Sequence, residues 1–472
     1  MNYDEAMSFL KGTEKYGSRL GLDSIRKLMR ELGDIQEKLP IVHIAGTNGK
    51  GSAGAMLSSV LAESGYRVGR FNTPDVFSYE EEYLQNGVPI ERERLARLFT
   101  EVSKACGRII KRGLPHPTRF EVESAAAFLW FYEERFDIAL VEVGLGGETD
   151  ATNLIKKPLI SVLTSISMDH MSFLGNTLPE VAAAKAGIIK RGCRVVSVGQ
   201  NPEVTEIILK KCRRERAELY FADENRAENL VCSEGKISFL WDMSAFDSGM
   251  DDGERRDSIC LSEEDSASVK CRQGGSVYVR ITPGLRGRFQ LENTVCALKV
   301  LELLKEKYPA ISCSSVVRGL RKTRWPGRFE QIAAAPDVYL DGAHNEDAAA
   351  KLRDSLDLYF PNRRVIFIMG VLADKEYEKM IRIMFRADDR VYTLTPPNPR
   401  ALSAVDLAIQ LKKQKIDAIS CVNPRDAVSY ALAEAKEEDV ILAFGSLSYL
   451  RVVRQVFRDM ISGSVSEADF GI

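Results

Sequence analysis

The stretch IVHIAGTNGKGSAG, Ile41–Gly54, joins an apolar, strand-like run to a helix-like run through a glycine-rich loop. A standard phosphate-binding loop reads G-x-x-x-x-G-K-[ST], with the hydroxyl residue directly after the lysine. Here Gly51 separates Lys50 from Ser52, and Ile44 stands where the first glycine is required. The order of strand, glycine-rich loop and helix still favours a phosphate site, because backbone N–H groups and a helix N-terminus attract anions.

Each polar residue of this loop has a chemical use at such a site. Gly46, Gly49 and Gly51 allow backbone N–H groups to turn toward an anion. Lys50 can neutralise phosphate charge, and the Ser52 hydroxyl can reach a metal ion. A tight turn that merely uses glycine is the structural alternative. The placement of both Lys50 and Ser52 after a strand favours the phosphate site.

The composition describes a soluble globular protein. Hydrophobic residues make up 45% and charged residues 28% of 472 residues, and 65 basic against 67 acidic side chains leave a net charge of −2. No overall basic field exists to bind nucleic acid or an anionic membrane. The N-terminus lacks an apolar signal segment, no long apolar run occurs, and the nine cysteines form no C-x-x-C pair. We therefore expect a cytoplasmic protein with free thiols.

Short apolar runs alternate with helix-like segments, which predicts an α/β fold with a mostly parallel sheet. The strands expected in the N-terminal part are Ile41–Ala45, Arg67–Asn72, Asp137–Val143, Leu159–Ser165 and Arg194–Val198. The helices expected there are Ala53–Ser64, Arg92–Lys111, Glu121–Arg135 and Leu178–Ile189. After a helix at Gln290–Tyr308 the rhythm returns, with strands at Asp337–Leu340, Arg364–Met369, Arg390–Thr395 and Asp439–Phe444.

This pattern predicts two domains, a P-loop-type ATPase domain over residues 1–322 and a smaller Rossmann-like α/β domain over residues 323–472. Between Asp242 and Ser268 the chain has nine acidic residues, two arginines and several Ser, Gly and Met residues. Such a segment has little to bury, so we expect a surface insertion at about 242–275. A solvated loop is favoured there over a partner-binding segment.

Three further residues occupy positions that suit a site at the sheet edge. In open α/β sheets, ligands bind beyond the carboxyl ends of the strands. Glu142 ends the apolar run FDIALVE, where a magnesium ligand beside a phosphate loop is expected, although an ordinary strand-end acid is the alternative. His170 follows the run LISVLTSISMD. Lys185 lies among small apolar residues of an expected helix, and alone it indicates nothing.

These segments, in this order, resemble the Mur ligase superfamily, whose loop has the form G-T-N-G-K-[GT]-[ST]. The closer resemblance is to the folylpolyglutamate synthase and dihydrofolate synthase family, and it covers nearly the whole chain. The motifs that carry it are LGLDSIRKLMRELGD before the loop, HIAGTNGKGS, TRFEVESAAAF, VEVGLGGETDATN, SISMDH…LGNTLPEVAAAKAGIIK, RGRFQLENTVCAL, RWPGRFEQI, LDGAHN, GVLADKEY and AFGSLSYL. No single motif decides the assignment, but ten in register make chance agreement improbable.

The resemblance implies a role for each matching residue. The ATP-binding residues it implies are Gly46, Thr47, Asn48, Gly49, Lys50, Gly51, Ser52, Asn293, Arg328 and Asp341. The catalytic residues it implies are Lys50, His170 and Lys185, with a carbamylated Lys185. The ligands it implies for two Mg²⁺ sites are Ser52, Glu142, His170 and Lys185. The glutamate-binding residues it implies are His344 and Ser446. The folate-binding residues it implies are Thr73, Pro74, Asp75, Phe120 and Asp150.

The folate-binding half of the chain departs from the family pattern. Members usually read S-P-H-L followed by R-E-R-I where folate binds. Here Thr73-Pro74-Asp75-Val76 replaces the first motif, and Glu82-Tyr83 stands where Arg-Ile is usual. A carboxylate in place of an imidazole, together with a lost cation, alters how an anionic folate is held. The ATP and metal half therefore matches the family better than the folate half does.

The resemblance implies an ATP-dependent amide ligase that adds L-glutamate to dihydropteroate, to tetrahydrofolate (poly)glutamate, or to both, through an acyl phosphate. ATP and Mg²⁺ would be required, the other partners would be small molecules, and we expect a monomer. Two alternatives stay open. One is a Mur-type ligase with a different carboxylate acceptor. The other is a non-catalytic, nucleotide-binding regulatory protein whose acidic insertion binds a partner.

Overall fold

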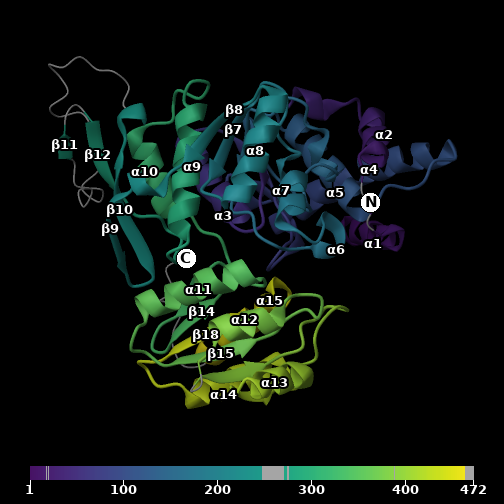
Figure 1. Ribbon diagram of the computed structural model, residues 1–472. Helices are drawn as coiled ribbons and strands as arrows, with labels where there is room; N and C mark the ends of the chain where they lie inside the picture. The colour runs from purple at the N-terminus through teal and green to yellow at the C-terminus, as the bar shows by residue number, and fades with distance from the viewer. Residues whose placement is uncertain (18, 20, 247–270, 274–275, 387–388, 463–472) are drawn as a thin grey trace. The chain divides into compact units, whose positions relative to one another are not determined.

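The computed structural model describes residues 1–17, 19, 21–246, 271–273, 276–386 and 389–462. The chain divides into two compact units (Figure 1). The first unit consists of Met1–Val231, Ser238–Gly284 and Gln290–Thr323. The second unit consists of Cys232–Ile237, Leu285–Phe289 and Arg324–Ile472. Two short segments from the middle of the chain thus belong to the second unit.

The first unit is built on an eight-stranded sheet with the order β4-β3-β2-β5-β1-β6-β7-β8. Its strands are β1 (Ile41–Ala45), β2 (Val68–Phe71), β3 (Tyr83–Gln85), β4 (Val88–Pro89), β5 (Ile138–Glu142), β6 (Ile160–Leu163), β7 (Arg194–Val198) and β8 (Glu218–Ala222). Only β3 and β4 pair antiparallel, at one edge. Every residue of β1 and β5 is buried, which explains why these strands read as continuous apolar runs.

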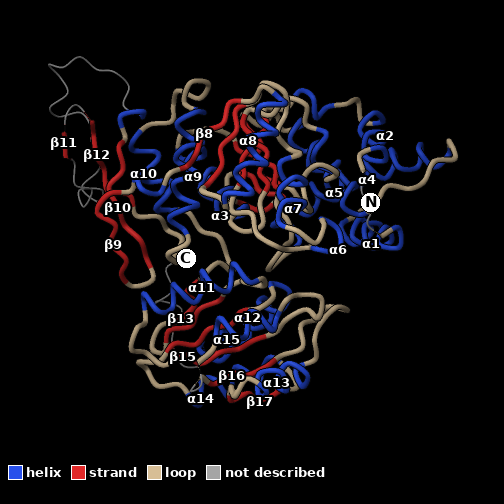
Figure 2. The backbone as a smooth tube through the Cα atoms, in the orientation of Figure 1, coloured by secondary structure: helices blue, strands red, loops and turns tan. Residues whose placement is uncertain are grey.

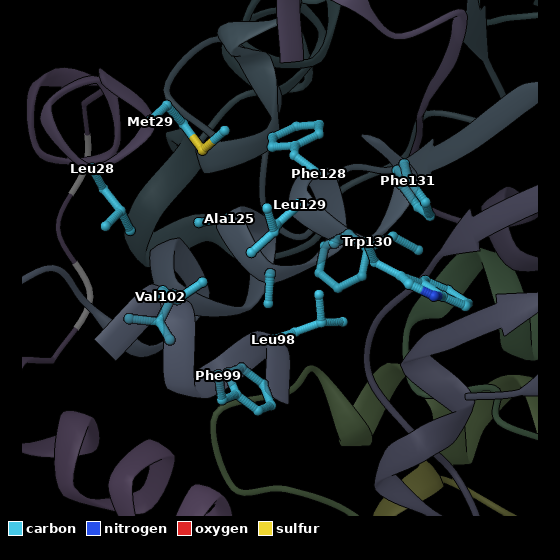
Figure 3. Packing of buried hydrophobic residues seen from close by; sticks show 14 of the residues in the cluster. Leu28, Met29, Leu98, Phe99, Val102, Ala125, Phe128, Leu129, Trp130 and Phe131 are labelled. Carbon is cyan, nitrogen blue, oxygen red and sulfur yellow. The ribbon is translucent and has the colours of Figure 1, made fainter. Parts of the chain in front are cut away.

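Helices surround this sheet, as the alternation of blue helices and red strands in Figure 2 shows. The helices of the first unit are α1 (Tyr3–Thr13), α2 (Asp23–Glu31), α3 (Lys50–Glu63), α4 (Arg92–Lys111), α5 (Arg119–Glu133), α6 (Met171–Leu174), α7 (Leu178–Ala186), α8 (Pro202–Glu215), α9 (Gln290–Leu304) and α10 (Cys313–Lys322). Leu98 and Phe99 of α4 pack with Ala125 and Phe128 of α5 in one apolar cluster (Figure 3). A second cluster lies under α7 and α8.

A small antiparallel sheet with the order β11-β12-β10-β9 follows β8. Its strands are β9 (Glu228–Ser233), β10 (Lys236–Asp242), β11 (Cys271–Gln273) and β12 (Ser276–Ile281). The expected surface insertion at about 242–275 therefore begins at the last residue of β10 and includes β11. Residues 247–270 and 274–275 of that insertion, including most of its acidic residues, lie outside the described residues.

The second unit has a six-stranded sheet with the order β13-β14-β18-β15-β16-β17. Its strands are β13 (Glu330–Ala333), β14 (Asp337–Leu340), β15 (Val365–Met369), β16 (Arg390–Thr393), β17 (Asp417–Ser420) and β18 (Val440–Phe444). Its helices are α11 (Glu346–Tyr359), α12 (Tyr377–Met384), α13 (Ala404–Lys413), α14 (Pro424–Glu434) and α15 (Leu447–Ser462). Only β13 pairs antiparallel. The expected α/β fold class with a mostly parallel first sheet is confirmed.

One helix boundary was predicted wrongly in a way that matters for the site. The sequence pattern placed the start of the helix after the loop at Ala53, but α3 begins at Lys50. Gly49 precedes it with a left-handed φ of 90°, so the turn ends there and Lys50, Gly51 and Ser52 form the first helical turn. The N–H groups of that turn have no partner within the helix, and they provide the positive end of the helix dipole.

Candidate active site

The loop between β1 and α3 requires glycine at two positions. Gly46 has a φ of 154°, and a Cβ there would lie 1.9 Å from Thr164 Oγ1. Gly49 has a φ of 90°, and a Cβ there would lie 2.2 Å from Asn293 Oδ1. A side chain at either position would displace a neighbour and strain the backbone. The glycines therefore allow a close approach of the loop to β6 and α9.

Hydrogen bonds of Thr47 and Asn48 hold the loop against the segment that follows β6. Thr47 N–H donates to the Ser165 carbonyl at 2.7 Å, and Asn48 N–H donates to the same oxygen at 3.2 Å. Thr47 Oγ1 donates to the Ser167 carbonyl at 2.9 Å and accepts from Ser167 N–H at 3.1 Å. These four hydrogen bonds hold the loop at the carboxyl end of the central strands, where ligands bind in open α/β sheets.

Two lysines converge on one carbonyl of the loop. Lys50 Nζ donates to Gly46 O at 3.1 Å and to Thr47 O at 3.2 Å, and it lies 3.8 Å from Glu142 Oε1. Lys185 Nζ, from α7, donates to the same Gly46 O at 2.9 Å. Burial, and then the charge of Lys50, lower the pKa of Lys185 to about 7. The structure thus brings Lys50, Glu142 and Lys185, which are far apart in sequence, around the glycine-rich loop.

Buried oxygen donors lie on the elements next to these lysines. Ser52 is buried in the first turn of α3, and its Oγ accepts from Gln290 Nε2 at 3.4 Å, while Asn293 Nδ2 donates to Gln290 Oε1 at 2.9 Å. Glu142 is buried at the end of β5. Among the described residues, no group of three or more His, Cys, Asp or Glu side chains could hold a metal ion. This donor set fits Mg²⁺, which binds through one or two carboxylates, substrate phosphates and water.

His170 and Asp169 lie after β6, beyond the end of the strand. His170 has a left-handed φ of 52°, its side chain is exposed, and its Nε2 lies 3.8 Å from Oδ2 of the buried Asp169. Asp169 Oδ1 accepts from the His170 N–H at 2.8 Å. Sequence reasoning missed Asp169, although it directly precedes the predicted histidine. Its charge acts on Lys185 and raises the pKa of that lysine against the larger effect of burial.

Asp150, which the resemblance assigns to the folate side, fixes the loop that follows Glu142. Its carboxylate accepts from Leu145 N–H at 2.8 Å, from Thr152 N–H at 2.9 Å and from Thr152 Oγ1 at 2.5 Å. Burial raises the pKa of Asp150, and these donors oppose that rise. Phe120 packs against Gly144, where a Cβ would lie 2.5 Å from the ring. Phe120 is half-buried and belongs to an aromatic group that includes Phe71.

The segment after β2 forms an acidic cluster that sequence reasoning only partly found. The Thr73–Pro74 peptide bond is cis, and Asp75 is half-buried. Glu82 is 4% exposed, and its Oε2 accepts no hydrogen bond from the described residues. Burial, and then the negative charge of Glu123, raise the pKa of Glu82. The sequence showed that Glu82 departs from the family pattern. It did not show that Glu123 lies beside Glu82, because α5 brings Glu123 there from about 40 residues away.

Arg119 is the cation that faces this acidic cluster from α5. Its Nε donates to Glu123 Oε1 at 2.8 Å, and its Nη1 pairs with Glu14 at 2.5 Å. Tyr79 OH also donates to Glu123 Oε1, at 3.1 Å. The spacing of Arg119 and Glu123 by four residues in TRFEVESAAAF was the available signal, because such pairs meet on one helix face.

In the second unit, three of the predicted ATP and glutamate residues, Asp341, His344 and Ser446, follow the ends of two neighbouring strands. Asp341 follows β14 and accepts from Phe329 N–H at 2.7 Å and from Ala343 N–H at 2.8 Å. Burial raises its pKa, while the nearby Arg328 opposes that rise. His344 Nδ1–H donates to Gly342 O at 2.8 Å. Ser446 follows β18, the neighbour of β14, and its hydroxyl lies 2.9 Å from Ser448 Oγ.

An α/β unit with a glycine-rich loop of the form GTNGKGS, followed by a smaller α/β unit, is the architecture that the Mur ligases share. Two known domains match the chain: the Mur ligase middle domain at residues 44–301 and the Mur ligase glutamate ligase domain at residues 327–447. The chain is a member of the Mur ligase family, as its sequence indicated.

Curated relatives narrow the assignment to one group. The chain is 32% identical over 457 residues to the dihydrofolate synthase/folylpolyglutamate synthase of Bacillus subtilis, covering 96% of this chain and 98% of that one. It is 28% identical over 458 residues to the folylpolyglutamate synthase of Lacticaseibacillus casei, with the same coverage of 96% and 98%. Within the Mur ligases, the chain belongs to the folylpolyglutamate synthase and dihydrofolate synthase group.

A solved structure supports the same group. The folylpolyglutamate synthase of Mycobacterium tuberculosis, complexed with ADP and AMPPCP, superposes with a TM-score of 0.80 at 26% identity. The match covers 97% of this chain and 99% of that one. Within the described ranges, no helix has the length and hydropathy needed to span a bilayer. The cysteine side chains that the structure places are free thiols.

Proposed function

We propose that this chain is an ATP-dependent ligase that joins L-glutamate to the carboxylate of dihydropteroate, of a tetrahydrofolate (poly)glutamate, or of both. The observation that carries the proposal is the GTNGKGS loop with Lys50, Glu142 and Lys185 gathered around it, in a chain whose relatives are named for this activity. The reaction class is phosphoryl transfer from ATP to a carboxylate, followed by attack of the glutamate amine on the resulting acyl phosphate.

The loop supplies most of what phosphoryl transfer needs from a protein, which is positioning and cationic stabilisation. The N–H groups of the first turn of α3 form the positive end of the helix dipole and would face the phosphates. Lys50 Nζ lies 3.8 Å from Glu142 Oε1. A cation and an anion thus lie side by side where the phosphates and a metal ion would bind. Ser52 and Glu142 would hold Mg²⁺, which would neutralise phosphate charge. His170 is the proposed ligand for a second ion.

Lys185 would act at this site in a modified form. Carbon dioxide reacts with an uncharged amine, and a pKa of about 7 leaves a large uncharged fraction of Lys185 near neutral pH. The uncharged amine and carbon dioxide form a carbamate and release one proton, so the side chain then carries a negative charge. We infer that the carbamate carries the carboxylate-like oxygens that a second Mg²⁺ would need. The buried, neutral-prone amine supports the inference.

The second unit would bind the remaining parts of the substrates. Arg328 and Asp341 are proposed to contact ATP, as is Asn293 of the first unit. His344 and Ser446 are proposed to orient L-glutamate. We propose residues 1–322 and 323–472 as the ATP-binding and glutamate-ligase domains, in a cytoplasmic monomer whose partners are small molecules.

The acceptor side departs most from the family pattern. Thr73, Pro74 and Phe120 are proposed to contact the folate, together with Asp75 and Asp150. The loop of Thr73–Asp75 leaves β2 at the sheet edge where β5 ends in Glu142, since the two strands are parallel neighbours. The carboxylates of Asp75, Glu82 and Glu123 make that region acidic. Each additional glutamate on an acceptor adds a negative charge, so acceptors with few glutamates should be preferred.

The test of the proposed function is phosphate release from ATP in the presence and absence of each substrate. The panel contains dihydropteroate, tetrahydrofolate with one to three glutamates, and a UDP-muramoyl peptide as the acceptor of another Mur ligase. We expect release only when L-glutamate and a pteroyl acceptor are both present. Equal turnover with the UDP-muramoyl peptide alone, or release without any acceptor, would overturn the proposal.

A further inference from the structure

A chain of three buried side chains runs from the strand that carries the phosphate loop to the loop that follows Glu142. His43 lies in β1, three residues before Gly46, and is fully buried. Its Nε2 lies 2.9 Å from Thr152 Oγ1. Thr152 Oγ1 lies in turn 2.5 Å from Asp150 Oδ1. None of the roles derived above uses His43 or Thr152.

The direction of each proton in this chain follows from counting donors. Three donors, Leu145 N–H, Thr152 N–H and Thr152 Oγ1–H, surround the Asp150 carboxylate and favour its ionised form. The single hydroxyl proton of Thr152 is therefore used on Asp150. The hydrogen bond between His43 and Thr152 must then come from His43 Nε2–H, with the threonine oxygen as the acceptor.

The histidine is held in one neutral tautomer. Burial lowers the pKa of His43 to about 3, so the ring is neutral at physiological pH. With the proton on Nε2, Nδ1 is an acceptor, and it has no hydrogen-bond partner among the described residues. A buried polar atom without a partner costs stability. The other ring nitrogen, Nε2, makes the hydrogen bond that orients the Thr152 hydroxyl.

The loop that this network shapes touches the helix that carries Lys185. Gly147 has no room for a side chain, because a Cβ there would lie 2.9 Å from the Lys185 carbonyl oxygen. Glu148 N–H donates to the Ala184 carbonyl at 2.8 Å. Asn153 Nδ2 donates to Glu148 O at 2.9 Å and reaches Gly187 O at 3.3 Å. The loop from Gly144 to Asn153 thus joins the end of β5 to α7.

We propose that His43 and Thr152 are positioning residues, which hold Glu142 and Lys185 in register with the phosphate loop through Asp150 and the Gly144–Asn153 loop. The proposal rests on the proposed function for the reaction itself. It rests on the hydrogen bonds of His43, Thr152 and Asp150 for the geometry. Neither residue is proposed to contact a substrate atom. They act by setting the separation between a metal-binding carboxylate on β5 and the lysine pair at Gly46.

The test compares isosteric and conservative variants at both positions. Thr152→Val keeps the side-chain volume and removes the hydroxyl, whereas Thr152→Ser keeps the hydroxyl. His43→Leu removes the donor, whereas His43→Gln places an amide N–H close to where Nε2–H stands. Supporting residues around metal sites typically change metal affinity or activity by about 10- to 100-fold. We expect Thr152→Val and His43→Leu to lower kcat and raise the half-saturating Mg²⁺ concentration at least about tenfold.

The same experiment needs a readout that does not depend on turnover. Calorimetric binding of AMPPCP is titrated at increasing Mg²⁺ for each variant, and Tm is measured for all of them. We expect Thr152→Ser and His43→Gln to bind and turn over within about threefold of wild type, as conservative variants of positioning residues should. We expect the KM for ATP at saturating Mg²⁺ to change far less than kcat. The double variant His43→Leu/Thr152→Val should lose no more activity and Mg²⁺ affinity than the more impaired of the two single variants, because both residues act through one network.

Two results would overturn the proposal. One is a lower Tm in Thr152→Val with unchanged kcat and unchanged half-saturating Mg²⁺, which would show a purely structural network. The other is a defect in His43→Gln equal to that in His43→Leu. Because Thr152→Val keeps its volume, it decides the outcome alone if His43→Leu does not fold. Failure of wild type to ligate any acceptor would overturn the proposed function instead, while the Mg²⁺-dependent AMPPCP titration would still report on the network.

Discussion

Lys50 and Lys185 donate hydrogen bonds to the same acceptor, the carbonyl oxygen of Gly46, at 3.1 and 2.9 Å. Two ammonium groups so placed repel each other, and Lys185 is buried whereas Lys50 is partly exposed. The pKa of Lys185 is accordingly lowered to about 7, by burial first and by Lys50 second. The glycine-rich loop therefore brings together two lysine side chains, of which the buried one, Lys185, has a lowered pKa.

The lowered pKa of Lys185 makes stability depend on pH in a known direction. The unfolded chain has the ordinary value of 10.5, so between pH 7 and about 10 it binds more protons than the folded chain. The free energy of unfolding should rise with pH in that window, and the rise should be smaller in Lys185→Met. Urea unfolding of both proteins at pH 7 and pH 10 measures a difference on the order of a few kcal/mol. Parallel pH profiles for the two proteins would contradict this prediction.

Modification of Lys185 can be observed directly. In isotopically labelled bicarbonate, wild-type protein should show a carbamate carbonyl resonance that Lys185→Met lacks. Lys190→Met is the matched control, because the pKa of Lys190 is also lowered, to about 8, mainly by burial. The resonance should persist in that control. A signal that survives in Lys185→Met, or disappears in Lys190→Met, would place the modification elsewhere.

The close approach of the phosphate loop to α9 can be tested with two glycines. Gly49 and Gly65 both have positive φ values, 90° and 86°, so an alanine at either position strains the backbone to a similar degree. Only at Gly49 would the new Cβ meet a neighbour, Asn293 Oδ1 at 2.2 Å, while Gly65 faces open space. We expect Gly49→Ala to lose nucleotide affinity by at least about tenfold and Gly65→Ala to retain it, although both lower Tm. Equal nucleotide affinities in the two variants would show that the close approach of Gly49 to Asn293 does not affect nucleotide binding.

The sequence predicted those features that depend on neighbouring residues. Ile41–Ala45 was placed to the residue, because a strand covered on both faces is apolar throughout. The helix after the loop was placed three residues late, because only the left-handed turn at Gly49 shows that Lys50 is already helical. The roles of Glu123 and His43 could not be predicted, since each depends on a partner that the fold brings from 40 or more residues away.

The buried carboxyl of Glu82 makes a separate prediction about the acceptor side. Burial and the charge of Glu123 raise its pKa above 4.5, so the unfolded chain ionises at a lower pH than the folded chain. The stability contributed by the protonated form is present below the unfolded pKa and is lost as pH rises through the folded pKa. Glu82→Gln, which keeps the volume without the charge, should therefore stabilise the protein more at pH 8 than at pH 5. Thermal unfolding at both pH values checks this, and a larger gain at pH 5 would contradict it.

Glutamate ligation can be observed by mass spectrometry of the products after incubation with ATP, Mg²⁺, L-glutamate, and dihydropteroate or tetrahydrofolate. We expect the acceptor to gain one or more glutamate residues, with one ADP and one phosphate released per residue added. Lys50→Ala should lower that yield by about 100-fold or more, as loss of one transition-state charge contact does, and the exposed Lys111→Ala should not. An unmodified acceptor with wild-type protein would contradict the proposed ligase activity, and a glutamylated acceptor formed equally well by Lys50→Ala would contradict the role of Lys50.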